Sequence, residues 1–422
     1  MPPPKKTSEA SSSFSSSSSV KKPILSATND DVSGPVIVID LGAYETKVTL
    51  SDKTDQIVTF PTVVACPLSS TSSSPSDIIV GDQAIKKCRK SAKKGSSDSD
   101  SYVLRYPIQR GLIMDWLQIE AILSFAFESI GVKDPSVYPV LIGLPGTMMP
   151  NDHIESIAEL LFEIFRVKHV YFELPNVMSF KGASPKNSFG LAVESGSALT
   201  YVTPIVDGKP QYGLTRKFTL AGQDATKYAI YVMSKTGFAV DPADEYRVAQ
   251  HIKTNMAYTC KNLKTEFELF AKNPAEFKQE LEMSGEKMTL DKECFLIPEI
   301  MFEPGLAGIT QAEVSSLPFT IFEAAKLAAD NDLNLLGKLL SNIVVGGGNL
   351  LFNGMAERIE TEVKSLVTKS KLKANVKVVP SRTEDALGAV IGGATWSDKA
   401  VNDMDWLTRN EYKQSGVSKF FK

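Results

Sequence analysis

Short, almost wholly apolar runs mark the ordered part of the chain. Residues 36–40 (VIVID) and 140–145 (VLIGLP) are apolar at nearly every position, which is typical of strands buried on both faces of a sheet. Between residues 152 and 165, apolar side chains recur at i, i+3 and i+4, which predicts an amphipathic helix. Together with the apolar run at 170–172, this strand–helix–strand order predicts a βαβ unit with parallel strands.

One ten-residue pattern occurs twice in the chain. Residues 40–49 and 194–203 both read acid-x-Gly-x-x-x-Thr-x-Val-Thr, and each copy follows an apolar run. In both copies a glycine separates two strand-like runs, which predicts a hairpin with a tight turn. Two similar hairpins so far apart in the sequence predict two related α/β domains that face each other.

A glycine cluster follows another apolar run near the C-terminal end, at residues 343–348 (IVVGGG). A buried strand that leads into a glycine-rich turn lets backbone N–H groups approach a ligand. The backbone of each hairpin can hold polyphosphate oxygens. Asp40 and Glu194 can hold a hydrated Mg²⁺, and Lys47 can reach a phosphate. These segments together predict a nucleotide cleft between two similar domains.

Composition and charge narrow the class of protein. The length of 422 residues predicts two or three core-forming units. There are 46 basic and 49 acidic residues, and a net charge of -3 argues against direct, sequence-specific nucleic-acid binding. No apolar run is long enough for a membrane span, and the first residues do not form a secretory signal. Four cysteines without CxxC spacing predict reduced thiols rather than a zinc site.

Two segments are expected to be surface features. Residues 1–34 are rich in serine and predict a disordered tail, either simply solvated or able to be phosphorylated or to bind a partner. The lysine-rich segment at 86–94 predicts either a solvated helix end or a surface for nuclear import or for an acidic partner.

The chain resembles actin and the actin-related proteins over residues 35–422. The most specific segment is the last, in which Trp406, Glu411, Tyr412 and Gly416 form the pattern W-x-x-x-x-E-Y-x-x-x-G, which other users of this ATPase fold lack. The segments that carry the resemblance are GPVIVIDLG (34–42), IIVGDQA (78–84), RYPIQRGLIMDW (105–116), LAGQDAT (220–226), VVGGGNLLFNGMAERI (344–359), IGGATW (391–396) and WLTRNEYKQSG (406–416).

The resemblance implies an α/β fold with two facing ribonuclease-H-like actin-fold domains, a nucleotide cleft between them and four subdomains. The implied divisions are a tail at 1–34, a first half at 35–190 with a small subdomain inserted at about 60–105, a second half at 191–395, and a C-terminal segment at 396–422 that packs back on the first half. The residues that match the family's nucleotide site are Asp40, Gly42, Lys47, Glu194, Ser195, Gly196, Gly347 and Gly348, with Asp40 and Glu194 as the metal-associated pair.

Several positions depart from the family's ATPase site, so no catalytic residue is assigned. Tyr44 stands where the family has a residue without a side chain, next to the phosphates. Pro175 replaces the glutamine that positions the attacking water, and a proline cannot orient water. In the second hairpin the family has two metal-associated acids. Glu194 matches the first of them, and Ser197 replaces the second. Thr254 and Ala386 replace the two side chains that contact adenine. Losing these groups together predicts very slow hydrolysis or none, while binding of ATP with Mg²⁺ is left open.

The predicted function is a non-hydrolysing or weakly hydrolysing scaffold subunit of a multiprotein complex. The lysine-rich segment favours chromatin remodelling, and a nuclear location, slightly. The alternatives are a cytoplasmic, cytoskeletal subunit of the dynactin or axonemal dynein type, or an ATP-binding, polymerising actin. Residues 69–77 align with the loop through which actin forms filament contacts. This stretch is polar and offers little apolar area to bury, which argues against such contacts. A partner helix is expected at the groove between the outer subdomains, near residues 406–421.

Overall fold

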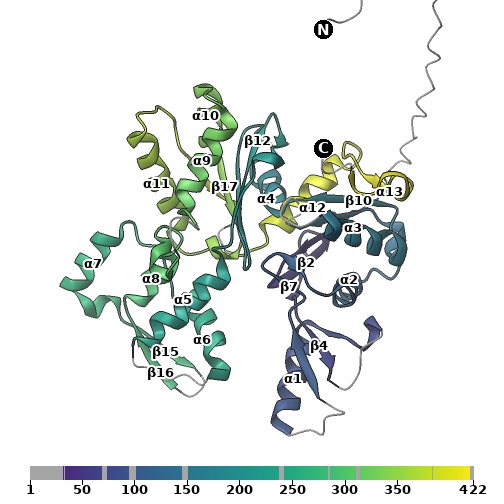
Figure 1. Ribbon diagram of the computed structural model, residues 1–422, viewed down its shortest axis with the longest axis horizontal. Helices are drawn as coiled ribbons and strands as arrows, with labels where there is room; N and C mark the ends of the chain where they lie inside the picture. The colour runs from purple at the N-terminus through teal and green to yellow at the C-terminus, as the bar shows by residue number, and fades with distance from the viewer. Residues whose placement is uncertain are drawn as a thin grey trace, which may run out of the picture.

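The chain folds into two halves that lie side by side. The structure is a computed structural model that describes residues 32, 34–68, 74–94, 101–144, 151–236, 242–283, 286–309, 314–382 and 384–418. The purple, blue and yellow parts of the chain form one half and the teal and green parts the other (Figure 1). The predicted tail, except Val32 and Gly34, and most of the loop at 69–77 lie outside the described residues. In the ranges just given, no helix is long and apolar enough to cross a membrane.

A six-stranded sheet forms the centre of the first half. In spatial order its strands are β19 (Leu407–Thr408), β10 (His169–Glu173), β9 (Val140–Gly143), β1 (Ile37–Leu41), β2 (Glu45–Leu50) and β3 (Val58–Pro61). β1 pairs antiparallel with β2 and parallel with β9, which in turn pairs parallel with β10. Every residue of β1 is buried, so apart from Asp40 its sequence is apolar without alternation.

The second half repeats this topology. In spatial order its strands are β13 (Lys209–Pro210), β12 (Thr200–Val206), β11 (Gly190–Ser195), β17 (Ile343–Gly346) and β18 (Val378–Pro380), with β14 (Arg216–Phe218) also paired to β12. β11 pairs antiparallel with β12 and parallel with β17, and β17 pairs parallel with β18. The two copies of the ten-residue pattern therefore form equivalent hairpins, β1–β2 and β11–β12, as the sequence predicted.

The first half carries a small subdomain and its own helices. The subdomain is a three-stranded sheet covered by one helix, and a short hairpin links it to the main sheet. Its elements are β4 (Val64–Pro67), β5 (Ile79–Val80), β6 (Tyr102–Arg105) and α1 (Gly81–Lys94), the linking hairpin is β7 (Ile108–Gln109) and β8 (Leu112–Ile113), and the main helices are α2 (Trp116–Ser129) and α3 (Asn151–Glu159). The helix predicted at 152–165 is α3 followed by a π-helical turn over 160–164.

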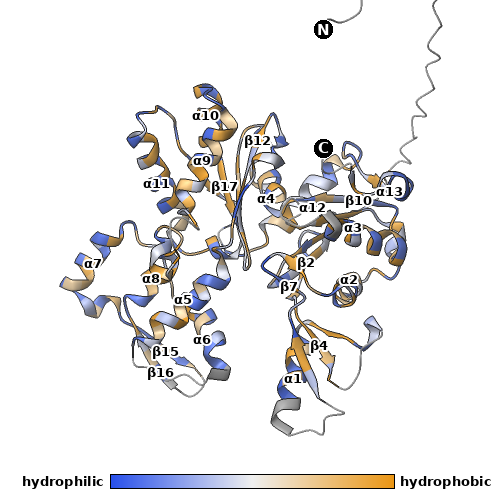
Figure 2. Cartoon of the chain, in the orientation of Figure 1, coloured by the Kyte–Doolittle hydropathy of each residue, from blue (hydrophilic) through white to orange (hydrophobic). Residues whose placement is uncertain are grey.

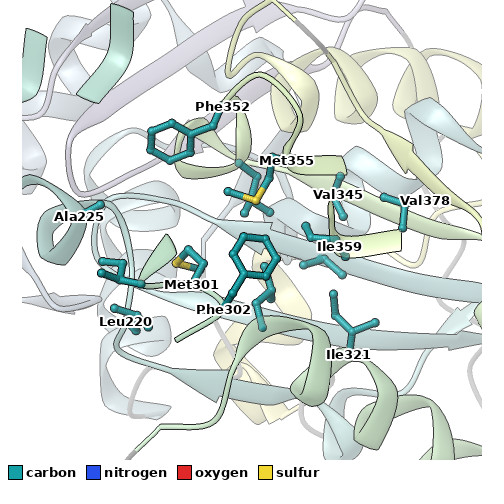
Figure 3. Packing of buried hydrophobic residues seen from close by; sticks show 14 of the residues in the cluster. Leu220, Ala225, Met301, Phe302, Ile321, Val345, Phe352, Met355, Ile359 and Val378 are labelled. Atoms are coloured by element: carbon teal, nitrogen blue, oxygen red, sulfur yellow. The ribbon is translucent and has the colours of Figure 1, made fainter. Parts of the chain in front are cut away.

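The second half has the largest core. Its helices and its outer two-stranded sheet are α5 (Gly222–Ser234), α6 (Pro242–Asn255), α7 (Leu263–Lys272), α8 (Glu293–Glu299), α9 (Leu317–Ala329), α10 (Leu333–Leu340), α11 (Met355–Lys369), β15 (Gln279–Met283) and β16 (Glu286–Leu290). Figure 3 shows Met301, Phe302, Ile321 and Ile359 packed beneath Val345 of the sheet. Hydrophobic residues gather in the sheets and on the helix faces toward them (Figure 2).

Two helices, α4 (Pro175–Ala183) and α12 (Gly388–Ala400), join the halves. α4 packs on β11 and β17 of the second half, whereas α12 packs on β1 and β9 of the first. They cross closely because glycines meet at the contact: a Cβ on Gly182 would come 2.5 Å from the Cα of Gly392. Any movement of one half against the other must bend or slide this pair.

The C-terminal segment lies against the first half. β19 pairs with β10, and α13 (Arg409–Ser415) follows it. Trp406 is buried with Val38 and Leu141, and the Trp406 indole donates a hydrogen bond to the Val401 carbonyl at 2.7 Å. Residues far apart in the chain thus complete one sheet.

Candidate functional site

A cavity of about 280 Å³ lies between the two halves. Ligand sites for small molecules usually enclose about 300–1,000 Å³, so this cavity is at the small end. The hairpin turns β1–β2 and β11–β12, the start of α4, helix α6 and the loop after β17 all contribute to its wall. The lining includes Asp40, Gly42, Tyr44, Glu45, Lys47, Gly111, Pro175, Glu194, Gly196, Ser197, Leu199, Tyr201, Gln250, Lys253, Thr254, Gly347, Gly348, Asn349 and Ala386.

The first hairpin places Lys47 directly across from Asp40. The Lys47 Nζ lies 3.3 Å from Asp40 Oδ2, and both side chains are buried. Burial by itself lowers the pKa of Lys47, but the charges of Asp40 and Glu45 outweigh it, so the pKa of Lys47 is raised. The ammonium group is therefore a fixed cation, and it already has a carboxylate partner in its own hairpin.

The second hairpin has a different pair at the equivalent positions, because Tyr201 lies across from Glu194. Burial and the charge of Asp40 raise the pKa of Glu194 to about 8, although the charge of Lys47 and a hydrogen bond from Ser179 act the other way. Burial also raises the pKa of the Tyr201 hydroxyl. Without a cation of its own, the second hairpin holds Glu194 as a neutral acid at neutral pH.

The predicted glycines allow close backbone approach around the cavity. Gly347 has φ +90°, and a Cβ there would lie 2.6 Å from Glu194 Oε1. Of the eight residues predicted to bind the nucleotide, seven line the cavity. Ser195 does not: it is fully buried, and its Oγ lies 2.7 Å from Thr200 Oγ1 and accepts a hydrogen bond from the Asn349 amide at 3.0 Å. Ser195 thus joins β11, β12 and the turn after β17.

All five positions predicted to depart from the family pattern lie in the cavity wall. Tyr44 sits in the β1–β2 turn with 42% of its side chain exposed. Pro175 begins α4 and is buried, where its fixed φ and missing N–H suit the first turn of a helix. Ser197, Thr254 and Ala386 occupy the wall on the side of the second half. The replacements predicted from separate parts of the sequence therefore share one site.

Lys253 is a cavity residue that sequence reasoning missed. It is 8% exposed, and its Nζ donates to the Gly222 carbonyl at 3.1 Å. Burial lowers the pKa of Lys253 to about 8. Ala249 and Ile252 define the buried stripe of α6, and a lysine at i+4 from Ala249 interrupts that stripe. A charged residue inside an apolar helical stripe was the signal that could have found it.

Comparison with known proteins identifies the family. Residues 31–421 match the sequence model of the actin family. The chain belongs to the actin family. Among curated proteins it is similar to actin-related protein 2 of Saccharomyces cerevisiae, at 26% identity over 405 residues that cover 92% of this chain and 97% of that protein. The actin-fold, two-domain α/β architecture predicted from the sequence is thereby confirmed.

Proteins of the actin family generally bind ATP with Mg²⁺, and the residues of this cavity do not fit that pair well. Mg²⁺ is held through oxygen ligands, but the Asp40 carboxylate is paired with Lys47 and Ser197 supplies only a hydroxyl. Across the described ranges, no three His, Cys, Asp or Glu side chains form a metal-binding group. The carboxylates of Asp40 and Glu45 and the neutral acid of Glu194 share the cavity with two lysines, so the lining has no excess of positive charge for a polyanion.

Proposed function

We propose that this protein is a structural subunit of a multiprotein complex, an actin-related scaffold that does not hydrolyse ATP. The proposal rests on Pro175, which lines the cavity at the start of α4, at the position where the resemblance to the family predicts a water-positioning glutamine. A proline offers neither an amide nor a backbone N–H to orient water. Loss of a positioning group of this kind costs orders of magnitude in rate.

The other charged groups of the cavity support the same proposal. Lys47 is bound to Asp40, so transferring it to a phosphate would cost that buried pair. Tyr44 adds a bulky side chain to the turn that would approach the phosphates. In our proposal the cavity is the hinge region of a scaffold, and a nucleotide bound there would stabilise the fold without being turned over.

Phosphate release from Mg-ATP in single turnover, with the protein in excess, tests the proposal. Wild-type protein should release no phosphate beyond that released by Lys47→Ala. This variant removes a cavity lysine that interacts with Asp40 and Glu194, the acids of both hairpins, so any release that remains reports contaminating ATPases. Pro175→Gln should likewise release none, since Tyr44, Ser197, Thr254 and Ala386 remain. Release that depends on Lys47 would refute the proposal.

The complex we favour is a chromatin-remodelling assembly in the nucleus. The support is the basic surface of α1, where Lys86, Lys87, Arg89 and Lys90 are exposed and could meet nuclear-import or acidic partners. The alternative is a cytoplasmic, cytoskeletal complex of the dynactin or axonemal dynein type. Affinity purification of the full chain at its natural level, with identification of co-purifying subunits, distinguishes them: a remodelling ATPase supports the first and a dynein or dynactin subunit the second.

A third possibility, an ATP-binding actin that polymerises, has a separate test. Sedimentation in Mg²⁺, ATP and salt should leave the purified protein in the supernatant at all concentrations. Pelleting above a sharp critical concentration would refute the scaffold proposal and support a filament.

Only part of the C-terminal segment is accessible to the partner helix that the sequence predicts. Residues 406–421 were expected beside it, but Trp406, Leu407 and Val417 are turned into the core, so they cannot contact a partner. The exposed positions Asn410, Lys413, Gln414 and Ser415 make the outer face of α13 polar. We therefore place the contact of a partner helix on this polar face, where charge reversal at Lys413 should weaken it.

A further inference from the structure

We propose that side chains of the chain itself clasp the two halves together across the cavity, so that the closed arrangement does not require a bound nucleotide. The clasp consists of an ion pair between Arg110 and Asp224 and a buried hydrogen bond between Tyr212 and Glu173. Each contact joins a residue of the first half to one of the second.

Arg110 makes the stronger contact. It lies in the turn of the β7–β8 hairpin, and its guanidinium donates to both carboxylate oxygens of Asp224 on α5, at 2.9 and 2.8 Å. The same guanidinium donates to the Thr219 carbonyl at 3.0 Å. Asp224 is also held by its own helix, because its Oδ2 accepts the Ala221 N–H at 3.0 Å. A bidentate ion pair between two side chains that are held in position by other hydrogen bonds is stronger than a typical surface ion pair.

The backbone around Arg110 is shaped for this reach. Arg110 has φ +49° and Gly111 has φ +80°, a left-handed geometry that is costly for arginine and persists only when its surroundings require it. A Cβ on Gly111 would collide with the Leu199 side chain of the second hairpin. The β7–β8 turn is therefore seated on the opposite half, and Arg110 extends from a turn that already touches it.

The second contact is close to the hinge helices. Tyr212 lies in a short 3-10 helix of the second half, and its hydroxyl donates to Glu173 Oε1 at 2.8 Å. The same oxygen accepts the Leu174 N–H at 2.8 Å, just before α4. Glu173 is 5% exposed, so opening this bond would leave a buried carboxyl without its side-chain donor, at a desolvation cost.

The two contacts flank the cavity. Gly111, next to Arg110, lines it on one side, and Pro175, two residues after Glu173, lines it near the hinge. Rotation about the α4–α12 crossing would have to break at least one of the contacts. In a cavity poorly matched to a metal-bound triphosphate, these side chains supply the cross-links that a ligand bound by both halves would otherwise provide.

Distance measurement between spin labels tests the clasp directly. Labels at Lys90→Cys on α1 and Lys287→Cys on β16, both at exposed positions of the outer parts, report opening in a Cys66→Ser, Cys88→Ser background. The ligand-free parent should give one distance distribution, unchanged by Mg-ATP. Arg110→Ala should lower the closed-to-open ratio about tenfold, equivalent to about 1.4 kcal/mol.

Arg409→Ala is the matched control. It breaks an ion pair to Glu163 whose arginine is about as exposed as Arg110 but which lies within the first half, so it should leave the distribution unchanged. Asp224→Asn should act like Arg110→Ala while keeping the cap on Ala221. In Arg110→Ala with Tyr212→Phe, a second, longer distance should hold more than a tenth of the molecules.

Two results would overturn the clasp. One is a double variant that folds, by circular dichroism, and gives the parent's distance distribution. The other is a parent protein that is broadly distributed until Mg-ATP narrows it, since the closed state would then depend on the nucleotide.

Discussion

Glu173→Gln should make the protein more stable at pH 8 than the wild type, and by an amount that depends on pH. Glu173 Oε1 accepts two hydrogen bonds, from the Leu174 N–H and the Tyr212 hydroxyl. A glutamine oxygen can accept both, and its amide nitrogen replaces the other carboxyl oxygen. The substitution therefore removes the charge of a buried group and keeps its shape.

The magnitude follows from the pKa of the carboxyl. Burial raises the pKa of Glu173 to about 7, even though the two hydrogen bonds and the charge of Lys181 lower it. Against an unfolded value of about 4.3, that difference corresponds to about 4 kcal/mol at full ionisation. Because the folded state holds the proton more tightly, the wild type loses stability as the pH rises from about 4.3 to 7 and then levels off.

Urea unfolding at pH 5, 6, 7 and 8 measures this difference. The free energy of unfolding of Glu173→Gln minus that of the wild type should grow by about 2–3 kcal/mol between pH 5 and 8. Tyr171, Tyr212 and Lys181 also face this carboxyl. Burial raises the pKa of both tyrosine hydroxyls, so these two keep their protons in that range, and burial lowers the pKa of Lys181.

Glu360→Gln serves as the control for this series. Burial would raise the pKa of Glu360, but hydrogen bonds from Lys364 and the Val378 N–H outweigh it, so the pKa is lowered. Its stability difference from the wild type should therefore stay constant between pH 5 and 8. An equally constant difference for Glu173→Gln would refute the reasoning about the buried carboxyl.

Four further substitutions test the packing and the buried charges by urea unfolding. Gly392→Ala should lower the free energy of unfolding by about 3 kcal/mol, because a Cβ there collides with the Met178 carbonyl at the α4–α12 crossing. Its control, Gly337→Ala, has no atom near the new Cβ and should be neutral or stabilising by up to about 1 kcal/mol. Lys253→Met should stabilise by about 2 kcal/mol at pH 7, where the wild type buries a charged lysine whose pKa is lowered to about 8. That gain should shrink between pH 8 and 10 as the wild-type lysine loses its proton, and a gain that is constant with pH would contradict its cause. Arg358→Met should cost about 3–5 kcal/mol, because it leaves the fully buried Glu299 without its cation, and a neutral result would contradict the pairing.

Much of the site could be predicted because its parts are local. The strand–turn–strand pattern at residues 40–49 and 194–203 depends on short apolar runs and on the placement of a glycine within ten residues, and the hairpins formed as expected. The five replaced positions were recognised one at a time from the resemblance, and they all line one cavity. What could not be predicted was which groups are already bonded, such as Lys47 to Asp40, or that Ser195 is buried away from the cavity.

The sequence by itself determined the strands and the repeated hairpin, because apolar runs and turn chemistry act over a few residues, and its motifs carried the resemblance to the family. Tertiary structure alone decided the contacts between the halves. Arg110 and Asp224 are 114 residues apart, and no local pattern marks either as a partner of the other. It also decided the protonation of buried groups, because the pKa values of Glu173 and Lys253 move only when folding takes these side chains out of water.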